Sequence, residues 1–240
     1  MAEVTLPEDK ELALEEHLTE LRNRLVVVLA AVAVFSCIIF IFTGDIINFI
    51  KKDMLPAGAK LIALNPLEYL YMRFMLSVIG AAIICVPLIV YEIFKFMKPG
   101  LYPSERKFFI KVVPASMLLF ILGAAFSYIV LIPFSIKYLI SYAEGVAVPM
   151  LVLSRFISFL SFMLLGIGLI FQLPLVTSFL VKAELIKKSD LKEKRKYVYA
   201  ILFLIAVALA PDPTPVTPLV ILVTLGIVYE ISIIFAGYLL

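Results

Sequence analysis

The sequence predicts an all-α, polytopic integral membrane protein, and two observations support that prediction. Hydrophobic residues make up 63% of the 240 residues and charged residues 16%, whereas a soluble globular domain is roughly 45–50% apolar. The apolar residues also gather into segments of about 18–20 residues, the length at which a helix crosses a hydrocarbon core of about 30 Å. No Ser/Gly-rich linker divides the chain, so we expect a single transmembrane domain over residues 1–240.

Six transmembrane helices are expected in order along the chain. Four segments reach spanning length, at residues 25–42, 69–94, 112–131 and 156–181. Two weaker segments follow at residues 197–210 and 219–240, separated by a proline-rich turn. Because residues 197–210 rise only about 21 Å as a helix, this short hairpin either thins the bilayer or does not cross it fully. Bending prolines favour a concave surface over a closed bundle, and the helices carry Pro87, Pro114, Pro133 and Pro174.

The positive charges predict the orientation, because loops rich in Lys and Arg stay on the cytoplasmic side. The N-terminal segment and the loops at 95–111 and 182–196 hold 15 Lys and Arg residues, and the alternate loops hold six. We therefore expect both termini in the cytoplasm. The basic residues form no stripe interleaved with aromatic residues, so nucleic acid is not an expected partner.

The composition also argues against several kinds of chemistry. His17 is the single histidine, and Cys37 and Cys85 lie inside apolar runs, which leaves too few groups for a multi-histidine metal site or a Ser/His/Asp triad. The sequence has no phosphate-binding loop of the GxxxxGK[ST] type. We expect no enzyme activity, no cofactor and no metal.

Residues about 12–24 form a predicted amphipathic helix ahead of the first span. Its leucines, Leu14, Leu18, Leu21 and Leu25, cluster on one side at 100° per residue, while Glu16, Glu20 and Arg24 lie well round the helix. One interpretation pairs Glu20 with Arg24 at i,i+4. The other leaves Glu20 exposed to the cytoplasm as a ligand-binding carboxylate.

The loop at 95–111 places a second carboxylate on the same side of the membrane. Ser104 is positioned to cap the next helix, so Glu105 falls in its first turn, where a carboxylate suits the helix dipole. The functional alternative is that Glu20 and Glu105 converge on a cationic ligand. Guanidinium fits best, because it is planar, always charged and donates two parallel bonds to a carboxylate.

At these residues the sequence resembles the TatC family, the multispanning receptor subunits of the twin-arginine protein translocase. Three stretches carry the resemblance: residues 17–24 (HLTELRNR) match HLxELRxR, residues 96–106 (FMKPGLYPSER) match FxxPxLxxxER, and residues 166–174 (GIGLIFQLP) resemble GxxFExP. Supporting matches occur at residues 65–68 (NPLE), 210–212 (APD) and 229–231 (YEI). Six patterns in the expected order cover residues 15 to about 238.

The resemblance implies a bent, cup-like array of six helices in the plasma (inner) membrane. It further implies that the protein binds twin-arginine signal peptides of folded cargo, assembles with TatA-type and TatB-type single-span subunits, and associates with itself in the complex. By the same resemblance, the residues of the signal-peptide surface are Glu20, Arg22, Phe96, Pro99, Leu101, Glu105 and Arg106. Glu68 and Asp212 match positions in extracytoplasmic turns, although Asp212 is also an ordinary turn former after Pro211.

One position departs from the family pattern. Gln172 stands where the family usually has an intramembrane glutamate, so no role that requires titration is available there. Gln172 either satisfies backbone groups freed by Pro174, such as the carbonyl of Ile170, or docks a polar residue of a partner's transmembrane helix. Glu230, 11 residues into the last expected helix, is a second candidate for such docking, whereas Glu92 is expected to form a structural salt bridge near the inner surface.

A secondary transporter of a small solute is the alternative function, because it too would show six spans and kinked helices. Against it, the two halves of the chain show no repeat, and Gln172 alone lies clearly at mid-depth. An intramembrane protease would need a buried aspartate pair or a serine–histidine pair, and the aspartates fall in loops or at span ends.

Overall fold

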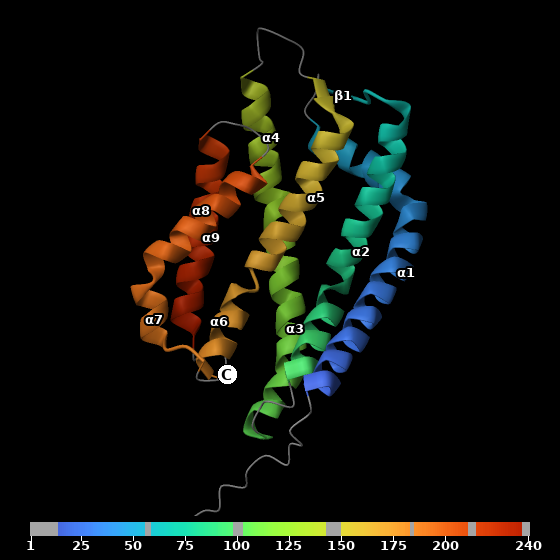
Figure 1. The fold of residues 1–240 in the computed structure, drawn as a ribbon. Coiled ribbons are helices and arrows are strands. Elements are labelled where there is room, and N and C mark those ends of the chain that lie inside the picture. Colours follow the sequence, from blue (N-terminus) through green and yellow to red (C-terminus); the bar gives the residue numbers. More distant parts are fainter. Residues whose placement is uncertain are drawn as a thin grey trace, which may run out of the picture.

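The computed structural model describes residues 14–55, 59–97, 103–142, 150–182, 185–210 and 215–236. Side chains are not described for residues 14, 94, 97 and 103–112. The described chain is almost wholly helical, and its helices run roughly along one common direction (Figure 1). Five helical segments are long and apolar enough to cross a membrane, namely Glu15–Met54, Pro66–Ile93, Val113–Ser141, Leu153–Lys182 and Val216–Phe235.

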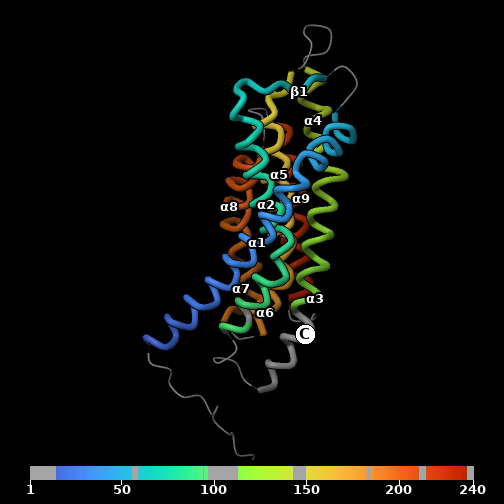
Figure 2. Tube along the Cα trace, turned by 90° about the vertical axis from the view of Figure 1, so that its right-hand side faces the viewer, coloured from blue at the N-terminus to red at the C-terminus, as the bar shows by residue number. Residues whose placement is uncertain are grey.

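Helix α1, Leu14–Met54, joins the expected amphipathic helix and the first expected span into one helix of 41 residues. At 1.5 Å per residue this is about 61 Å, roughly twice the hydrocarbon core. The helix continues past residue 42 because one glycine, Gly44, costs only about 1 kcal/mol in a helix, and because buried Thr43 is engaged by Arg73 of α2. Helix α1 packs along α2, Pro66–Met97, and its first turns lean away from the rest of the bundle (Figure 2) while they still contact the end of α2.

The third expected span is the middle of a longer helical rod. Helix α3, Pro103–Phe126, runs into a π-helical turn, η2, at Ser127–Leu131, and then into α4, Ile132–Ser141. The apolar segment predicts an end at residue 131, and Pro133 just beyond it is expected to bend its helix. Instead, the wider π turn, closed by the N–H of Ile132 donating to the carbonyl of Ser127, accommodates the proline near the start of α4.

A small clasp closes the end of the bundle opposite the start of α1 (Figure 1). Strands β1, Lys60–Ile62, and β2, Met150–Val152, pair in parallel with Lys60 opposite Met150. Beside them, the Glu68 carboxylate accepts backbone N–H groups from Leu64 at 2.6 Å and Ser154 at 2.8 Å. Glu68 therefore ties the first turn of α2 to the start of α5.

Helix α5, Leu153–Ile170, forms the centre of the hydrophobic core and contacts α2, α3, α8 and α9. The single span expected at 156–181 is interrupted at residues 171–172, and α6, Leu173–Lys182, continues beyond the break. Two glycines allow α3 and α5 to approach closely. A Cβ on Gly168 would lie 2.5 Å from the Phe120 ring, and one on Gly123 would lie 2.7 Å from Phe171.

One helix of the C-terminal hairpin is short, as expected, whereas the other, α9, is long enough to cross a membrane. After α7, Lys188–Glu193, helix α8, Arg195–Leu209, has 15 residues and packs against α9, Val216–Phe235. Helix α8 therefore rises only about 22 Å, and in Figure 1 its upper end lies below the level of the β1–β2 clasp. Helix α1 begins and α9 ends at the same end of the bundle, which we call the N-terminal end.

Candidate functional site

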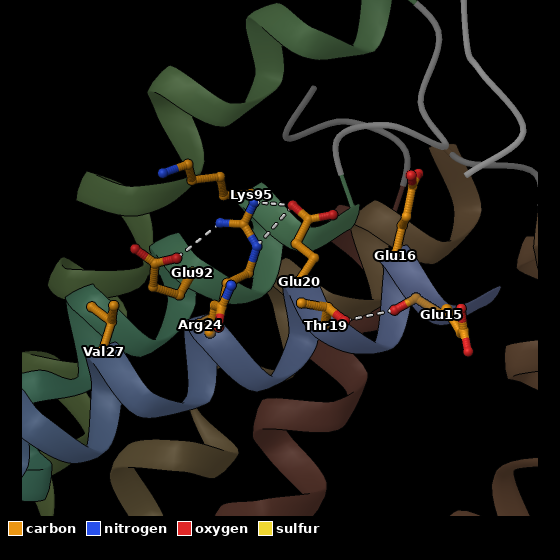
Figure 3. A pocket seen from close by; sticks show the side chains of 9 residues that line it. Glu15, Glu16, Thr19, Glu20, Arg24, Val27, Glu92 and Lys95 are labelled. Carbon is orange, nitrogen blue, oxygen red and sulfur yellow. Dashed lines mark hydrogen bonds and ion pairs between the residues drawn. The ribbon is translucent and has the colours of Figure 1, made fainter. Parts of the chain in front are cut away.

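A groove of about 620 Å³ opens at the N-terminal end, where the first turns of α1 meet the last turns of α2 (Figure 3). It is rich in carboxylates, and its lining residues are Glu15, Glu16, Thr19, Glu20, Asn23, Arg24, Val27, Glu92 and Lys95. The two helices run antiparallel, so the start of one meets the end of the other. This juxtaposition brings together two of the stretches that the sequence marks as functional.

Arg24 lies at the centre of the groove and bridges two carboxylates. Its Nε donates to Oε1 of Glu20 at 3.1 Å, and its Nη2 pairs with the same oxygen. Its Nη1 donates to Oε2 of Glu92 at 2.9 Å. The side chains of Arg24, Glu20 and Glu92 are 15%, 26% and 11% exposed. The i,i+4 pair expected from the sequence is therefore present, and a second helix supplies a second carboxylate to it.

The groove carries more negative than positive charge. Its described lining includes four glutamates against Arg24 and Lys95. The Lys95 ammonium lies 5.7 Å from the centre of the Tyr91 ring, and among the described residues the Glu92 carboxylate forms its ion pair with Arg24 rather than with Lys95. A cationic ligand is thus the chemistry that this groove favours.

An aromatic pair links the two helices beside the groove. The rings of His17 on α1 and Phe96 on α2 stack with centroids 4.3 Å apart and an interplanar angle of 24°. This contact fixes the last turn of α2 against the first turns of α1, immediately before the connection to α3. The motif residues His17, Glu20 and Phe96 therefore share one surface.

The remaining predicted signal-peptide residues are only partly placed. Arg22 is exposed on α1. Glu105 and Arg106 lie in the first turn of α3, at the N-terminal end, but their side chains fall outside the described part of the chain, as do Pro99 and Leu101 altogether. The convergence of Glu20 and Glu105 therefore stays a prediction.

Gln172 lies at the break between α5 and α6, and its side chain is buried at 8% exposure. Its Nε2 donates to the carbonyl of Ser116 on α3 at 3.1 Å. The hydrogen bond expected with the carbonyl of Ile170 is not the one formed: the amide bridges two helices rather than repairing its own kink. Its Oε1 is buried without a partner in the described structure, as is Oγ of Ser116.

Glu230 is paired within the chain. Its carboxylate accepts a hydrogen bond from Arg195 at 2.6 Å and another from the Tyr199 hydroxyl at 2.8 Å. These partners lie on the first two turns of α8, so Glu230 joins α9 to α8, and its docking role stays a prediction. Of the predicted extracytoplasmic pair, Glu68 forms the interhelical cap described above, and Asp212 lies outside the described residues.

Glu92 was expected to form a structural salt bridge near Lys95, three residues further along the chain, but its partner is Arg24. Arg24 is 68 residues away along the chain, so local spacing could not reveal the pair. The pair could have been found by assuming that the first two helices pack antiparallel, because that packing places residues near 92 opposite residues near 24. The described residues contain no group of three His, Cys, Asp or Glu side chains that could hold a metal ion.

The helices and the groove define the class of protein: a polytopic α-helical membrane protein with an acidic groove at the end where its chain begins. The family model described as TatC, Sec-independent protein translocase protein, matches residues 16–223. The chain belongs to the TatC family.

Individual relatives agree with this assignment. The TatC of Methanocella arvoryzae is 36% identical over 239 residues, which cover 99% of each chain. The TatC of Aquifex aeolicus is 35% identical over 92% of each chain. A crystal structure of the twin-arginine translocase receptor TatC superposes with a TM-score of 0.85 at 34% identity, covering 92% of this chain and 99% of that one. The predicted family, fold class and translocase function are confirmed, and the solute-transporter alternative is set aside.

Proposed function

We propose that the groove between α1 and α2 binds the twin-arginine signal peptide of folded cargo, with Glu20 and Glu105 each accepting one guanidinium. The observation that carries this proposal is that Glu20 already holds a guanidinium, that of Arg24, at the wall of an acidic groove. A carboxylate held in that position is ready for a second such group.

The chemistry supports arginine over lysine in the ligand. A guanidinium donates parallel hydrogen bonds to a carboxylate, and a lysine ammonium acts as a point charge. Each charged hydrogen bond at a half-desolvated surface is worth about 1.5–3 kcal/mol. In this proposal Arg22, Phe96, Pro99, Leu101 and Arg106 shape the surrounding surface.

Photo-crosslinking tests the proposal. A photoreactive residue at Asn23, which lines the groove and leaves both carboxylates intact, is exposed to a labelled signal peptide with its arginine pair intact or changed to lysines. We expect crosslinking to the arginine peptide, and its loss in the Glu20→Ala/Glu105→Ala double variant. Unchanged crosslinking in the double variant contradicts the proposal, and Glu230→Ala serves as the matched carboxylate control.

We also propose that the protein lies in the plasma (inner) membrane with its N-terminus in the cytoplasm. The excess of Lys and Arg in the N-terminal segment and the loops at 95–111 and 182–196 supports this orientation. Labelling of single cysteines in intact cells tests it. A cysteine at Lys192 should be protected from an impermeant reagent, and one at Lys60 should react; the reverse pattern contradicts the orientation.

The proposed partners are TatA-type and TatB-type single-span subunits, together with further copies of this chain. Gln172 supports a docking role for the break between α5 and α6, because its Oε1 is a buried acceptor without a described partner and a partner's polar residue would relieve that cost of about 1–3 kcal/mol. Co-purification tests the role: Gln172→Leu should weaken association, and Gln172→Asn should weaken it less. Equal association of all three proteins restricts Gln172 to bridging α5 and α3.

A further inference from the structure

We infer that Arg24 is a built-in competitor for the signal-peptide site and that Glu92 sets how strongly it competes. The inference deepens the proposed function and rests on it. It assigns Glu92 as a positioning residue, which acts on the incoming peptide through Arg24 rather than by touching it.

The distribution of hydrogen bonds within the cluster carries the first step. Both contacts between Arg24 and Glu20 use a single oxygen, Oε1 of Glu20. The other oxygen, Oε2, makes no hydrogen bond to a described residue and points away from Arg24 (Figure 3). A peptide guanidinium can therefore begin to bind at Oε2 before Arg24 leaves.

Burial carries the second step. Arg24 is only 15% exposed, and a half-buried guanidinium that lost its carboxylate would be left poorly solvated. Glu92 prevents this, because its bond to Nη1 survives when Nε and Nη2 release Glu20. Glu92 thereby lowers the free-energy cost of breaking the contact between Arg24 and Glu20, and so it favours peptide binding.

Accessibility separates the roles of the two carboxylates. Glu92 is 11% exposed and Glu20 is 26% exposed, so an incoming peptide reaches Glu20 more readily. The net effect is an exchange of partners: the peptide takes Glu20, and Arg24 keeps Glu92. Without Glu92, Arg24 would hold Glu20 as its one remaining described carboxylate and oppose the peptide.

A double-mutant cycle with the full-length protein in nanodiscs tests the inference, with a labelled twin-arginine signal peptide as the probe. Glu92→Gln should weaken binding roughly five- to twentyfold, and Arg24→Gln should tighten it by a similar factor. The Arg24→Gln/Glu92→Gln double variant should match Arg24→Gln within about twofold, because Glu92 has nothing to hold once Arg24 is removed.

Glu16→Gln is the matched control, since it removes the same charge from the same groove, and Glu16 makes no described contact with Arg24. Its effect should be clearly smaller than that of Glu92→Gln, because Glu16 is exposed and its charge is screened at moderate salt. Glu92→Asp, which keeps the charge, guards against misfolding and should bind more tightly than Glu92→Gln.

Two outcomes overturn the inference. If Glu92→Gln and Glu16→Gln weaken binding equally, Glu92 acts only through its charge. If Glu92→Gln weakens binding as much in the Arg24→Gln background as in the natural protein, Glu92 contacts the peptide directly. A failure of the proposed function is distinguishable, because Glu20→Gln would then leave peptide binding unchanged.

Discussion

Two arginine–glutamate clusters stand at the N-terminal end of the bundle, and they are built differently. In the groove between α1 and α2, one guanidinium, Arg24, is shared by two carboxylates. In the C-terminal hairpin, Arg195 pairs with one carboxylate, Glu230, which also accepts the Tyr199 hydroxyl. The arginine is 15% exposed in the first cluster and 43% exposed in the second.

The difference shows how arginine and glutamate can form either a structural ion pair or part of a ligand-binding groove. The hairpin cluster is balanced in charge and joins α8 to α9, and nearby Tyr229 donates to the carbonyl of Leu191 in α7. The groove cluster keeps one carboxylate beyond charge balance, and it lines an open groove. This difference supports the proposal that the groove cluster binds the ligand and that the hairpin cluster supports the structure.

The largest expected effect separates the two clusters by peptide binding. Glu20→Gln should weaken binding of a twin-arginine signal peptide by roughly 10- to 100-fold, as expected when a charged hydrogen bond worth about 1.5–3 kcal/mol is lost. Glu230→Gln should change binding by less than about twofold, because surface pairs outside the site contribute little. Fluorescence anisotropy of a labelled peptide measures both. Equal losses would mean that the two clusters do not differ in function.

The second prediction concerns stability. Arg24→Gln should lower the free energy of unfolding by about 1–2 kcal/mol, because it leaves two half-buried carboxylates without their cation. Arg195→Gln should lower it by at most about 1 kcal/mol, because its pair is more exposed to solvent. Thermal unfolding in one detergent compares the variants, and a larger loss for Arg195→Gln would reverse the assignment.

The first cluster also marks the limit of what the sequence predicts. The Glu20–Arg24 pair is predicted by its i,i+4 spacing on one helix, and the transmembrane helices are predicted by the length of the apolar segments. Glu92 joins the cluster through the packing of α1 on α2, and no local pattern encodes that contact. The sequence thus predicted the helices that form the site and the Glu20–Arg24 ion pair, but it did not predict the Arg24–Glu92 ion pair.

The helix ends show the same limit. The short α8 was predicted because its apolar segment ends at the proline-rich turn, whereas α9, expected to be short as well, is long enough to span a membrane. The continuation of α1 to Met54 and of the α3 rod through Pro133 was not, because each depends on tertiary contacts or on a π turn that offsets a helix breaker. Repair of its own helix was one of the two roles predicted for Gln172, but the packing of α3 on α5 supplies Ser116 as the acceptor of its hydrogen bond.

The third prediction isolates the hydrogen bond that distinguishes the hairpin cluster. Tyr199→Phe removes the donor to Oε1 of Glu230 while keeping the ring that packs at 5.9 Å on Tyr229. It should lower the free energy of unfolding by about 0.5–1.5 kcal/mol and leave signal-peptide affinity unchanged. Chemical denaturation and peptide titration measure the two quantities on one sample. A loss of peptide affinity would give the hairpin a share in the site.

The smallest effect tests the aromatic pair beside each cluster. His17→Ala removes the ring stacked on Phe96 at 4.3 Å, a contact worth about 0.5–1.5 kcal/mol. Because that contact positions the end of α2 and not a peptide-binding carboxylate, peptide affinity should fall by only about two- to fivefold. Tyr229→Leu breaks the corresponding edge-to-face pair with Tyr199 and should lower stability without a change in affinity. If His17→Ala lowered stability but left peptide affinity unchanged, the His17–Phe96 pair would only hold α1 and α2 together, as the Tyr199–Tyr229 pair holds α8 and α9 together. The peptide-binding site would then consist of the carboxylates alone.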